Sequence, residues 1–219
     1  MNSSLLSLLV LAGIAIFLIL RLRSVLGTRE GFEKPPALPG SGRSDPRRDF
    51  EVIEGGPDED IIDHVEDGSD SAKALAAMKM AEPDFRVGEF LQGARQAYEM
   101  ILMAFERGDI DGLRPYLAPD VLESFESVIN QRNEQGLTIE AEFVGVREIS
   151  LQEATFDRDA SEADITVRFV GEMTSVVRNS DGEIIEGDPS EIKRQRAVWT
   201  FARTMGANDP NWALAATDG

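Results

Sequence analysis

The feature that most constrains the fold is a long apolar stripe at helical spacing between residues 85 and 108. Asp84 is expected to cap its start, because the carboxylate can accept free backbone N–H groups, and Gly108 suits the left-handed residue that ends many helices. A second one-sided helix is expected from Pro119 to Gly136. Neither helix is stable alone, so both need an apolar surface to cover. The stripe recurs in steps of three and four and consists of Val87, Phe90, Leu91, Ala94, Ala97, Tyr98, Ile101, Leu102 and Phe105.

The chain after residue 136 supplies that surface as a sheet. Apolar and polar residues alternate from Leu137 to Phe143, which is typical of a strand with one buried face. The alternation slips near Gly145, and this predicts a β-bulge. Residues 163–177, 197–201 and 212–216 alternate in the same way. Helices first and antiparallel strands after predict an α+β fold in which one curved sheet wraps around the long helix.

The N-terminal stretch, residues 5–20, is uncharged and has Ser7 as its only polar side chain. On an insertion scale it gains on the order of 4 to 7 kcal/mol in a membrane. Arginines follow the apolar run instead of preceding it, which favours an uncleaved anchor over the alternative, a cleaved signal peptide. We predict a single transmembrane helix within residues 1–26, with the N-terminus outside and the C-terminal part cytoplasmic. Its apolar positions include Leu5, Leu9, Ile14, Phe17 and Leu20.

Residues 27–82 are predicted to be a disordered acidic linker. They hold 7 basic and 14 acidic residues and are interrupted by Pro and Gly, and such a composition does not repay the entropy of ordering. Two apolar islands stand out in this background, Phe50–Ile53 and Ile61–Ile62. They are either without a role or short motifs that bind a partner.

Composition and motifs exclude several functions. The chain has 22 Lys and Arg against 40 Asp and Glu, a net charge of −18, which argues against nucleic acid as a partner. It has no Cys, its one His is His64 in the acidic linker, and no nucleotide, zinc-protease or hydrolase motif is present. We therefore predict no catalytic residue, no cofactor and no metal site, and no enzyme. Four aromatic residues either line a cavity between helix and sheet or fill the core: Tyr98, Tyr116, Trp199 and Trp212.

A series of short matches in a fixed order runs through the second half of the chain. It comprises Glu82-Pro83-Asp84-Phe85, Phe90-Leu91-Gln92-Gly93-Ala94-Arg95, Ala97-Tyr98-Glu99, Ala104-Phe105, Gly108-Asp109, Leu113-Arg114-Pro115-Tyr116-Leu117, Val121, Phe125 and Asp209-Pro210-Asn211-Trp212-Ala213-Leu214-Ala215-Ala216-Thr217. The pattern resembles the C-terminal domain of the TIM forty-four-like family, whose mitochondrial member is a membrane-associated scaffold of the presequence-import motor. The resemblance covers residues 83–219.

The resemblance implies a nuclear-transport-factor-2-like cone that acts as an adaptor or scaffold and binds a polypeptide partner at an inner membrane. The mitochondrial protein is peripheral and has a basic N-terminal region, so its chaperone and channel contacts are not carried over to this chain. The layout resembles a bacterial inner-membrane relative. Two alternatives remain open: a module that binds a lipid or small apolar ligand, and an enzyme using a buried carboxylate in the cavity. Cones of this fold often pair through the outer sheet face, so a homodimer is a further expectation.

Overall fold

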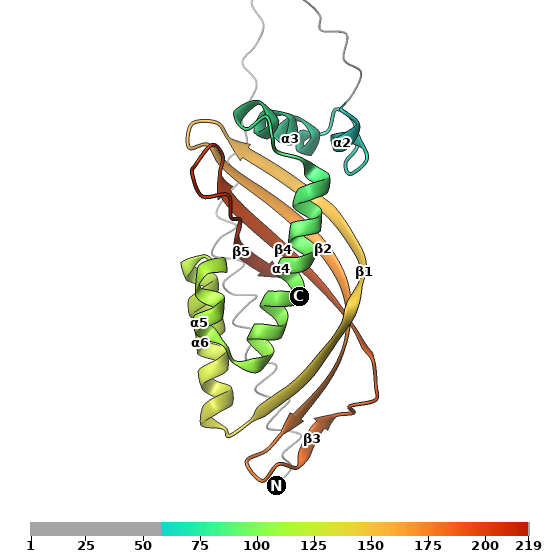
Figure 1. The fold of residues 1–219 in the computed structure, drawn as a ribbon, viewed down its shortest axis with the longest axis vertical. Helices are drawn as coiled ribbons and strands as arrows, with labels where there is room; N and C mark the ends of the chain where they lie inside the picture. The colour runs from blue at the N-terminus through green and yellow to red at the C-terminus, as the bar shows by residue number, and fades with distance from the viewer. Residues whose placement is uncertain (1–57, 219) are drawn as a thin grey trace, which may run out of the picture. The chain divides into compact units, whose positions relative to one another are not determined.

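The computed structural model describes residues 58–218 (Figure 1). The predicted transmembrane residues and the Phe50–Ile53 island lie outside this range, so those predictions stay predictions. Within residues 58–218, no helix has the length and apolar character that a membrane crossing requires. The elements are α2 (Glu59–Ile62), α3 (Asp70–Ala81), α4 (Val87–Arg107), α5 (Ile110–Leu113), the 3-10 turn η1 (Arg114–Tyr116), α6 (Pro119–Glu134), β1 (Thr138–Asp157), β2 (Glu162–Arg178), β3 (Ile184–Gly187), β4 (Lys193–Thr204) and β5 (Ala213–Asp218).

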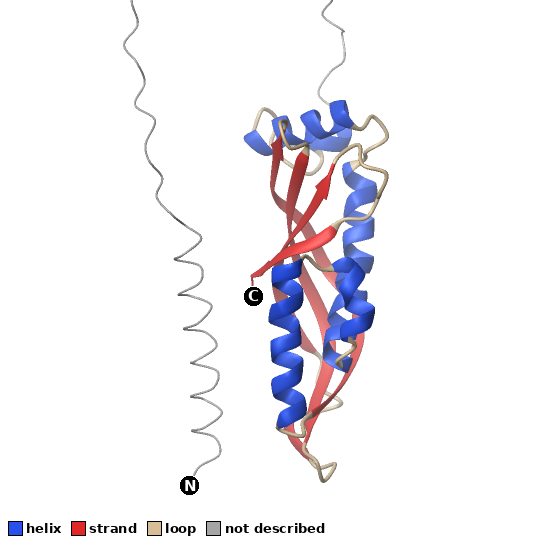
Figure 2. Cartoon of the chain, turned by 90° about the vertical axis from the view of Figure 1, so that its left-hand side faces the viewer, coloured by secondary structure: helices blue, strands red, loops and turns tan. Residues whose placement is uncertain are grey.

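The strands form one antiparallel sheet in the order β1-β2-β4-β5, and the short β3 pairs with β2 beyond the end of β4. The sheet is bowed, and the long helix α4 lies along its hollow side (Figures 1 and 2). The register of β1 against β2 shifts between Phe143 and Gly145, where the sequence predicted a bulge. The predicted α+β class is confirmed, and the arrangement is consistent with the nuclear-transport-factor-2-like cone.

The core forms where the apolar face of α4 meets the concave face of the sheet. The Tyr98 ring stacks on Phe169, with centroids 4.5 Å apart and planes 7° apart, and lies 4.8 Å from Trp199. A Cβ added at Gly171 would lie 2.9 Å from the Tyr98 ring. The sheet must therefore carry glycine at this point for the helix to approach so closely.

The folded unit begins earlier than the expected boundary at residue 83. Residues 58–82, assigned to the linker from their composition, form α2 and α3 (Figure 2). Leu75 and Met78 are fully buried, and Ile61, from the second apolar island, is 4 % exposed. The Ser71 hydroxyl accepts a 3.0 Å hydrogen bond from the Ala154 N–H of β1. This segment therefore covers one end of the sheet and completes the core.

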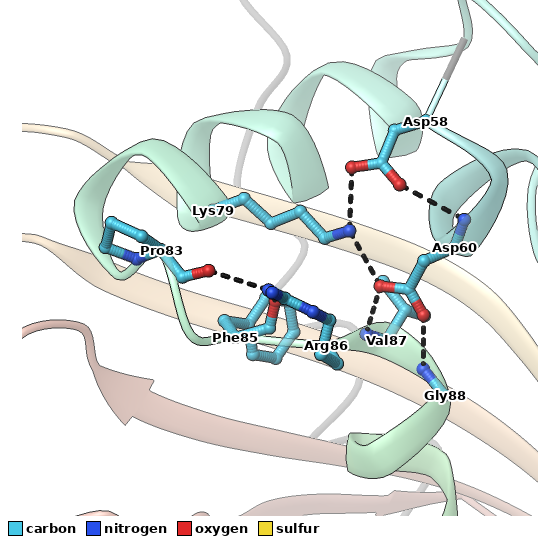
Figure 3. Close-up of polar contacts among 8 residues, drawn as sticks. All are labelled: Asp58, Asp60, Lys79, Pro83, Phe85, Arg86, Val87 and Gly88. Atoms are coloured by element: carbon cyan, nitrogen blue, oxygen red, sulfur yellow. Dashed lines mark hydrogen bonds and ion pairs between the residues drawn. The ribbon is translucent and has the colours of Figure 1, made fainter.

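The start of α4 is also capped differently from the prediction. The helix begins at Val87, so Asp84 lies too far outside it to act as its cap. Instead, the Asp60 carboxylate accepts hydrogen bonds from the backbone N–H groups of Val87 (2.9 Å) and Gly88 (3.0 Å), as Figure 3 shows. The Lys79 ammonium lies 2.7 Å from the same carboxylate. The cap comes from a residue 27 positions away, so no local pattern could indicate it.

The ends of the helices agree with their glycine signals. Gly108 follows α4 with φ 74°, and Gly136 follows α6 with φ 66°. Both values lie in the left-handed region that favours glycine over residues with a Cβ. Pro119 is the first residue of α6, as predicted.

Candidate functional site: an apolar groove beside helix α4

A groove of about 480 Å³ runs along one side of α4, between that helix, η1 and the loop that joins β4 to β5. This volume falls within the range of about 300–1,000 Å³ that is usual for ligand sites. Most of its lining is apolar or aromatic, and polar side chains are few. The lining residues are Glu89, Phe90, Gly93, Ala94, Gln96, Ala97, Met100, Tyr116, Phe201, Pro210, Asn211 and Trp212.

The groove exists because α4 carries small residues at its middle. Gly93, Ala94 and Ala97 form the floor, while the larger Phe90 and Met100 stand at either end. A Cβ built at Gly93 would meet no atom within 4 Å. Glycine at this place is therefore not required by packing, and its effect is to leave the groove open.

One wall of the groove is an aromatic side chain held by its neighbours. The Trp212 ring contacts Phe90 edge to face at a centroid distance of 4.8 Å and lies 6.0 Å from Phe85. The Arg203 guanidinium lies 6.0 Å from the centre of the same ring. Glu82 fixes Arg203 through contacts of 2.9 and 3.1 Å. The wall is thus positioned before any ligand arrives, which lowers the entropic cost of binding.

Two large apolar side chains in the groove are open to solvent. Met100 is 37 % exposed and Tyr116 is 36 % exposed. Grouped exposed apolar side chains with a polar rim are typical of a surface that binds another molecule. The rim is provided by Glu89, Gln96 and Asn211. The arrangement is suited to holding apolar groups with a few polar contacts.

The structure separates the four aromatic residues singled out from the sequence. Tyr116 and Trp212 line the groove. Tyr98 and Trp199 lie in the core, at 1 % and 6 % exposure. The floor at Gly93 was missed as a site, although a run of small residues inside an otherwise bulky helical stripe is a signal that could have indicated it.

A second, smaller hollow of about 270 Å³ lies where α4 ends beside α6 and the start of β1. It contains Glu106, whose pKa is raised by burial, an effect that Arg132 opposes. The two side chains lie 3.6 Å apart, and the Arg132 guanidinium also packs 4.4 Å from the centre of the Phe105 ring. Glu106 is therefore a largely buried carboxylate paired with Arg132. Among residues 58–218, no three His, Asp or Glu side chains gather as a metal site would require.

Comparison with known proteins agrees with the resemblance seen in the sequence. Human mitochondrial import inner membrane translocase subunit TIM44 is 23% identical over 160 residues, which are 73% of this chain and 35% of that protein. The Arabidopsis thaliana subunit TIM44-1 is 22% identical over 133 residues, 61% of this chain and 28% of that protein. The chain thus matches about a third of the length of these relatives.

Among solved structures, the intermembrane space region of the chloroplast protein ARC6 is similar at a TM-score of 0.36 and 10% identity, covering 57% of this chain and 94% of that one. This likeness is too low to bear on fold or function. The family is identified by sequence instead: the model of the family described as Tim44-like domain matches residues 71–219. That range takes in α3, the groove and the whole sheet, so the chain belongs to the Tim44-like domain family.

Proposed function

We propose that this protein is a non-catalytic adaptor that holds a polypeptide partner in the groove beside α4 and is fixed to an inner membrane by its N-terminal helix. The observation that carries the proposal is a groove with an open floor at Gly93 and with the exposed side chains of Met100 and Tyr116 in its lining, in a domain of this family. The human relative is a subunit of an import translocase of the mitochondrial inner membrane, and this supports the same interpretation.

The chemistry of the groove favours a segment of polypeptide with apolar side chains. Apolar walls give affinity through burial, at about 25 cal/mol per Å² of apolar surface. Glu89, Gln96 and Asn211 at the rim offer acceptors and donors that a peptide backbone can satisfy. A tether to the membrane raises the effective concentration of the domain near membrane partners without any new contact.

Photo-crosslinking in intact membranes tests the proposal. A benzoylphenylalanine placed at Met100 stands in the groove, whereas one at Met80, which is 80 % exposed on α3, lies outside it. We expect a defined polypeptide adduct from position 100 and not from position 80. Gly93→Leu fills the groove floor where a Cβ has open space, so the same adduct should disappear in that background while the protein stays folded.

Equal adducts from both positions would contradict a specific groove site. An adduct that persists in the Gly93→Leu background would do the same. Anchoring is tested separately by extracting membranes with high salt and with alkali: a protein with a spanning helix stays in the membrane fraction, and a variant lacking residues 1–26 should be released. A wild-type protein released by high salt would refute the spanning anchor.

A lipid or another small apolar ligand is the second candidate, because the groove is apolar and about 480 Å³ in volume. Native mass spectrometry of the full chain in detergent distinguishes the two. A retained mass of lipid size that is lost in Gly93→Leu would favour this candidate over the polypeptide.

A further inference from the structure

The convex face of the sheet carries a cluster of four arginines on three neighbouring strands. Residues 84–219 contain only 13 Lys and Arg against 26 Asp and Glu, so four of the 13 gather at one place. Their positions follow from the register, in which Glu172 pairs with Arg194, Val170 with Arg196 and Arg168 with Val198. We call this set the outer arginine cluster, and it consists of Arg147, Arg168, Arg194 and Arg196.

The cluster lies on the face opposite the groove. Side chains alternate between the two faces of a strand, and on β2 the alternate positions Ile165, Val167 and Phe169 are fully buried against the helices. Val170 follows Phe169 directly on the same strand, so its side chain faces the opposite, outer side of the sheet. It is nevertheless only 6 % exposed, and its cross-strand neighbours, Arg196 and Glu148, have side chains long enough to cover it.

Two members of the cluster share one internal carboxylate. Glu172 accepts hydrogen bonds from Arg147 at 2.7 Å and from Arg194 at 3.2 Å. The hydrogen bond from Arg147 is the main cause that lowers the pKa of Glu172, so this carboxylate stays ionised and belongs to the cluster. Arg168 pairs with Glu148.

Most of the cluster's donors have no hydrogen-bond or ion-pair partner among residues 58–218. The side chains of Arg147 and Arg194 remain 68% and 61% exposed despite their contacts with Glu172. Each guanidinium carries five N–H donors, and each of these two places one N–H on Glu172. Arg196 is exposed and has no ion pair with any residue from 58 to 218. With four cations against Glu148 and Glu172, the cluster has a local charge of +2 in a strongly acidic domain.

We propose that the outer arginine cluster is a second binding surface, which takes an extended acidic segment of a partner polypeptide. Arg194 and Arg196 are two residues apart on one strand and so roughly 6.6 Å apart along it. In an extended peptide, alternate side chains on one face repeat at the same spacing. Carboxylates at every second residue therefore match the guanidiniums, which bind carboxylates in a planar, two-pronged geometry.

The surroundings favour a peptide over a membrane or a second copy of this chain. Carboxylates border the cluster on the same face, among them Glu142, Glu153 and Asp164, which pair in register with β2 or lie on it. A broad anionic lipid surface would meet these carboxylates together with the arginines, whereas a narrow strand lying along β4 meets Arg194 and Arg196 on a strand that has no carboxylate of its own. Two copies joined by a twofold axis through the cluster would place arginine against arginine, and like charges in contact are unfavourable.

Fluorescence anisotropy of the full chain with a labelled peptide tests the proposal. The probe is a fluorescein-labelled peptide of alternating Glu and Thr. It is about twelve residues long, which matches the length of β4. Arg194→Gln/Arg196→Gln should raise the dissociation constant roughly fivefold to tenfold. The fold should be kept, because Glu172 retains Arg147 and Arg196 has no internal partner. The matched control, Lys73→Gln/Arg158→Gln, removes two exposed positive charges elsewhere and should change the constant less than about twofold.

A second peptide separates spacing from bulk charge. It has the same composition, but its glutamates are grouped at one end, and it should bind more weakly than the alternating peptide. Equal binding of the two peptides, an equal loss in the control variant, or no binding of the alternating peptide at low salt would each overturn the proposal. It would also be overturned if vesicles of phosphatidylglycerol, and not the peptide, bound in a manner that depends on Arg194 and Arg196.

Discussion

The carboxylate of Asp60 links the N-terminal segment, residues 58–82, to the start of α4. Asp60→Asn tests this role. The carboxylate accepts both N–H groups at the start of α4 and contacts the Lys79 ammonium at 2.7 Å. An asparagine has the same shape but no charge, and its amide oxygen is its only acceptor. The variant therefore loses the ion pair and part of the helix cap while leaving the packing unchanged.

The size of the loss follows from the pKa of this carboxyl. Burial by itself would raise the pKa of Asp60, but the hydrogen bonds from Lys79, Gly88 and Val87 outweigh it and lower the pKa from 3.8 to about 2. That difference corresponds to roughly 2.4 kcal/mol of stabilisation of the charged form. Solvent reaches 26% of the side chain, and screening reduces the effect. We expect Asp60→Asn to lower the free energy of unfolding by about 1–2 kcal/mol at neutral pH.

The effect should depend on pH in one direction. A carboxyl whose pKa is lower in the folded state contributes stability above its ordinary pKa and loses it as the pH falls through the folded value. The difference between wild type and Asp60→Asn should therefore be constant from neutral pH down to about 5 and should shrink between about 4 and 2. Urea unfolding of the full chain in detergent, followed by tryptophan fluorescence at several pH values, measures it.

Asp63→Asn is the matched control, because Asp63 follows the same short helix, is exposed and has no side-chain hydrogen bond or ion pair within residues 58–218. It should change the free energy of unfolding by less than about 0.5 kcal/mol. If the two variants were equally stable, or if the loss in Asp60→Asn were independent of pH down to 2, the assignment of Asp60 as the cap of α4 would be refuted.

Three substitutions probe other contacts, each read by the midpoint of urea or thermal unfolding. Gly171→Ala should cost about 1–3 kcal/mol, because its Cβ would lie 2.9 Å from the tightly packed Tyr98 ring. Ser71→Ala should cost about 1 kcal/mol, since it removes the acceptor for the Ala154 N–H; an unchanged midpoint would show that water replaces the hydroxyl. Gly93→Ala should stabilise by about 0.5–1 kcal/mol, because it removes a helical glycine where a Cβ has open space.

Local patterns in the sequence were sufficient to predict the helix and the strands that face one another across the core. The stripe from Val87 to Phe105 became α4, and the alternating runs became the long strands β1, β2 and β4. These patterns are reliable because a helix or strand that is apolar on one side can be buried in only one orientation. The helix end at Gly108 and the break in alternation near Gly145 could also be predicted, because each depends on the backbone conformation at one residue.

The features that the sequence did not reveal depend on contacts between distant residues. The acidic composition of residues 58–82 concealed Leu75 and Met78, which are buried because they meet the end of the sheet. The cap at Asp60 and the outer arginine cluster both depend on how elements come together. Arg147 and Arg194 stand beside Glu172 only because of the register of three strands. A count of charges along the chain gives no sign of such a grouping.

The groove and the outer arginine cluster lie on opposite faces of one sheet, and this arrangement predicts that the two surfaces bind independently. Phe201 and Arg196 belong to the same strand, β4, but Phe201 lines the groove while Arg196 points outward. No side chain belongs to both surfaces, so a substitution in one should leave the other within about 0.5 kcal/mol. Gly93→Leu should therefore keep the affinity for the alternating acidic peptide, and Arg194→Gln/Arg196→Gln should keep the crosslink at position 100. A change in either would show that the sheet transmits binding from one face to the other, and the protein would then be a coupled switch instead of an adaptor with two separate sites.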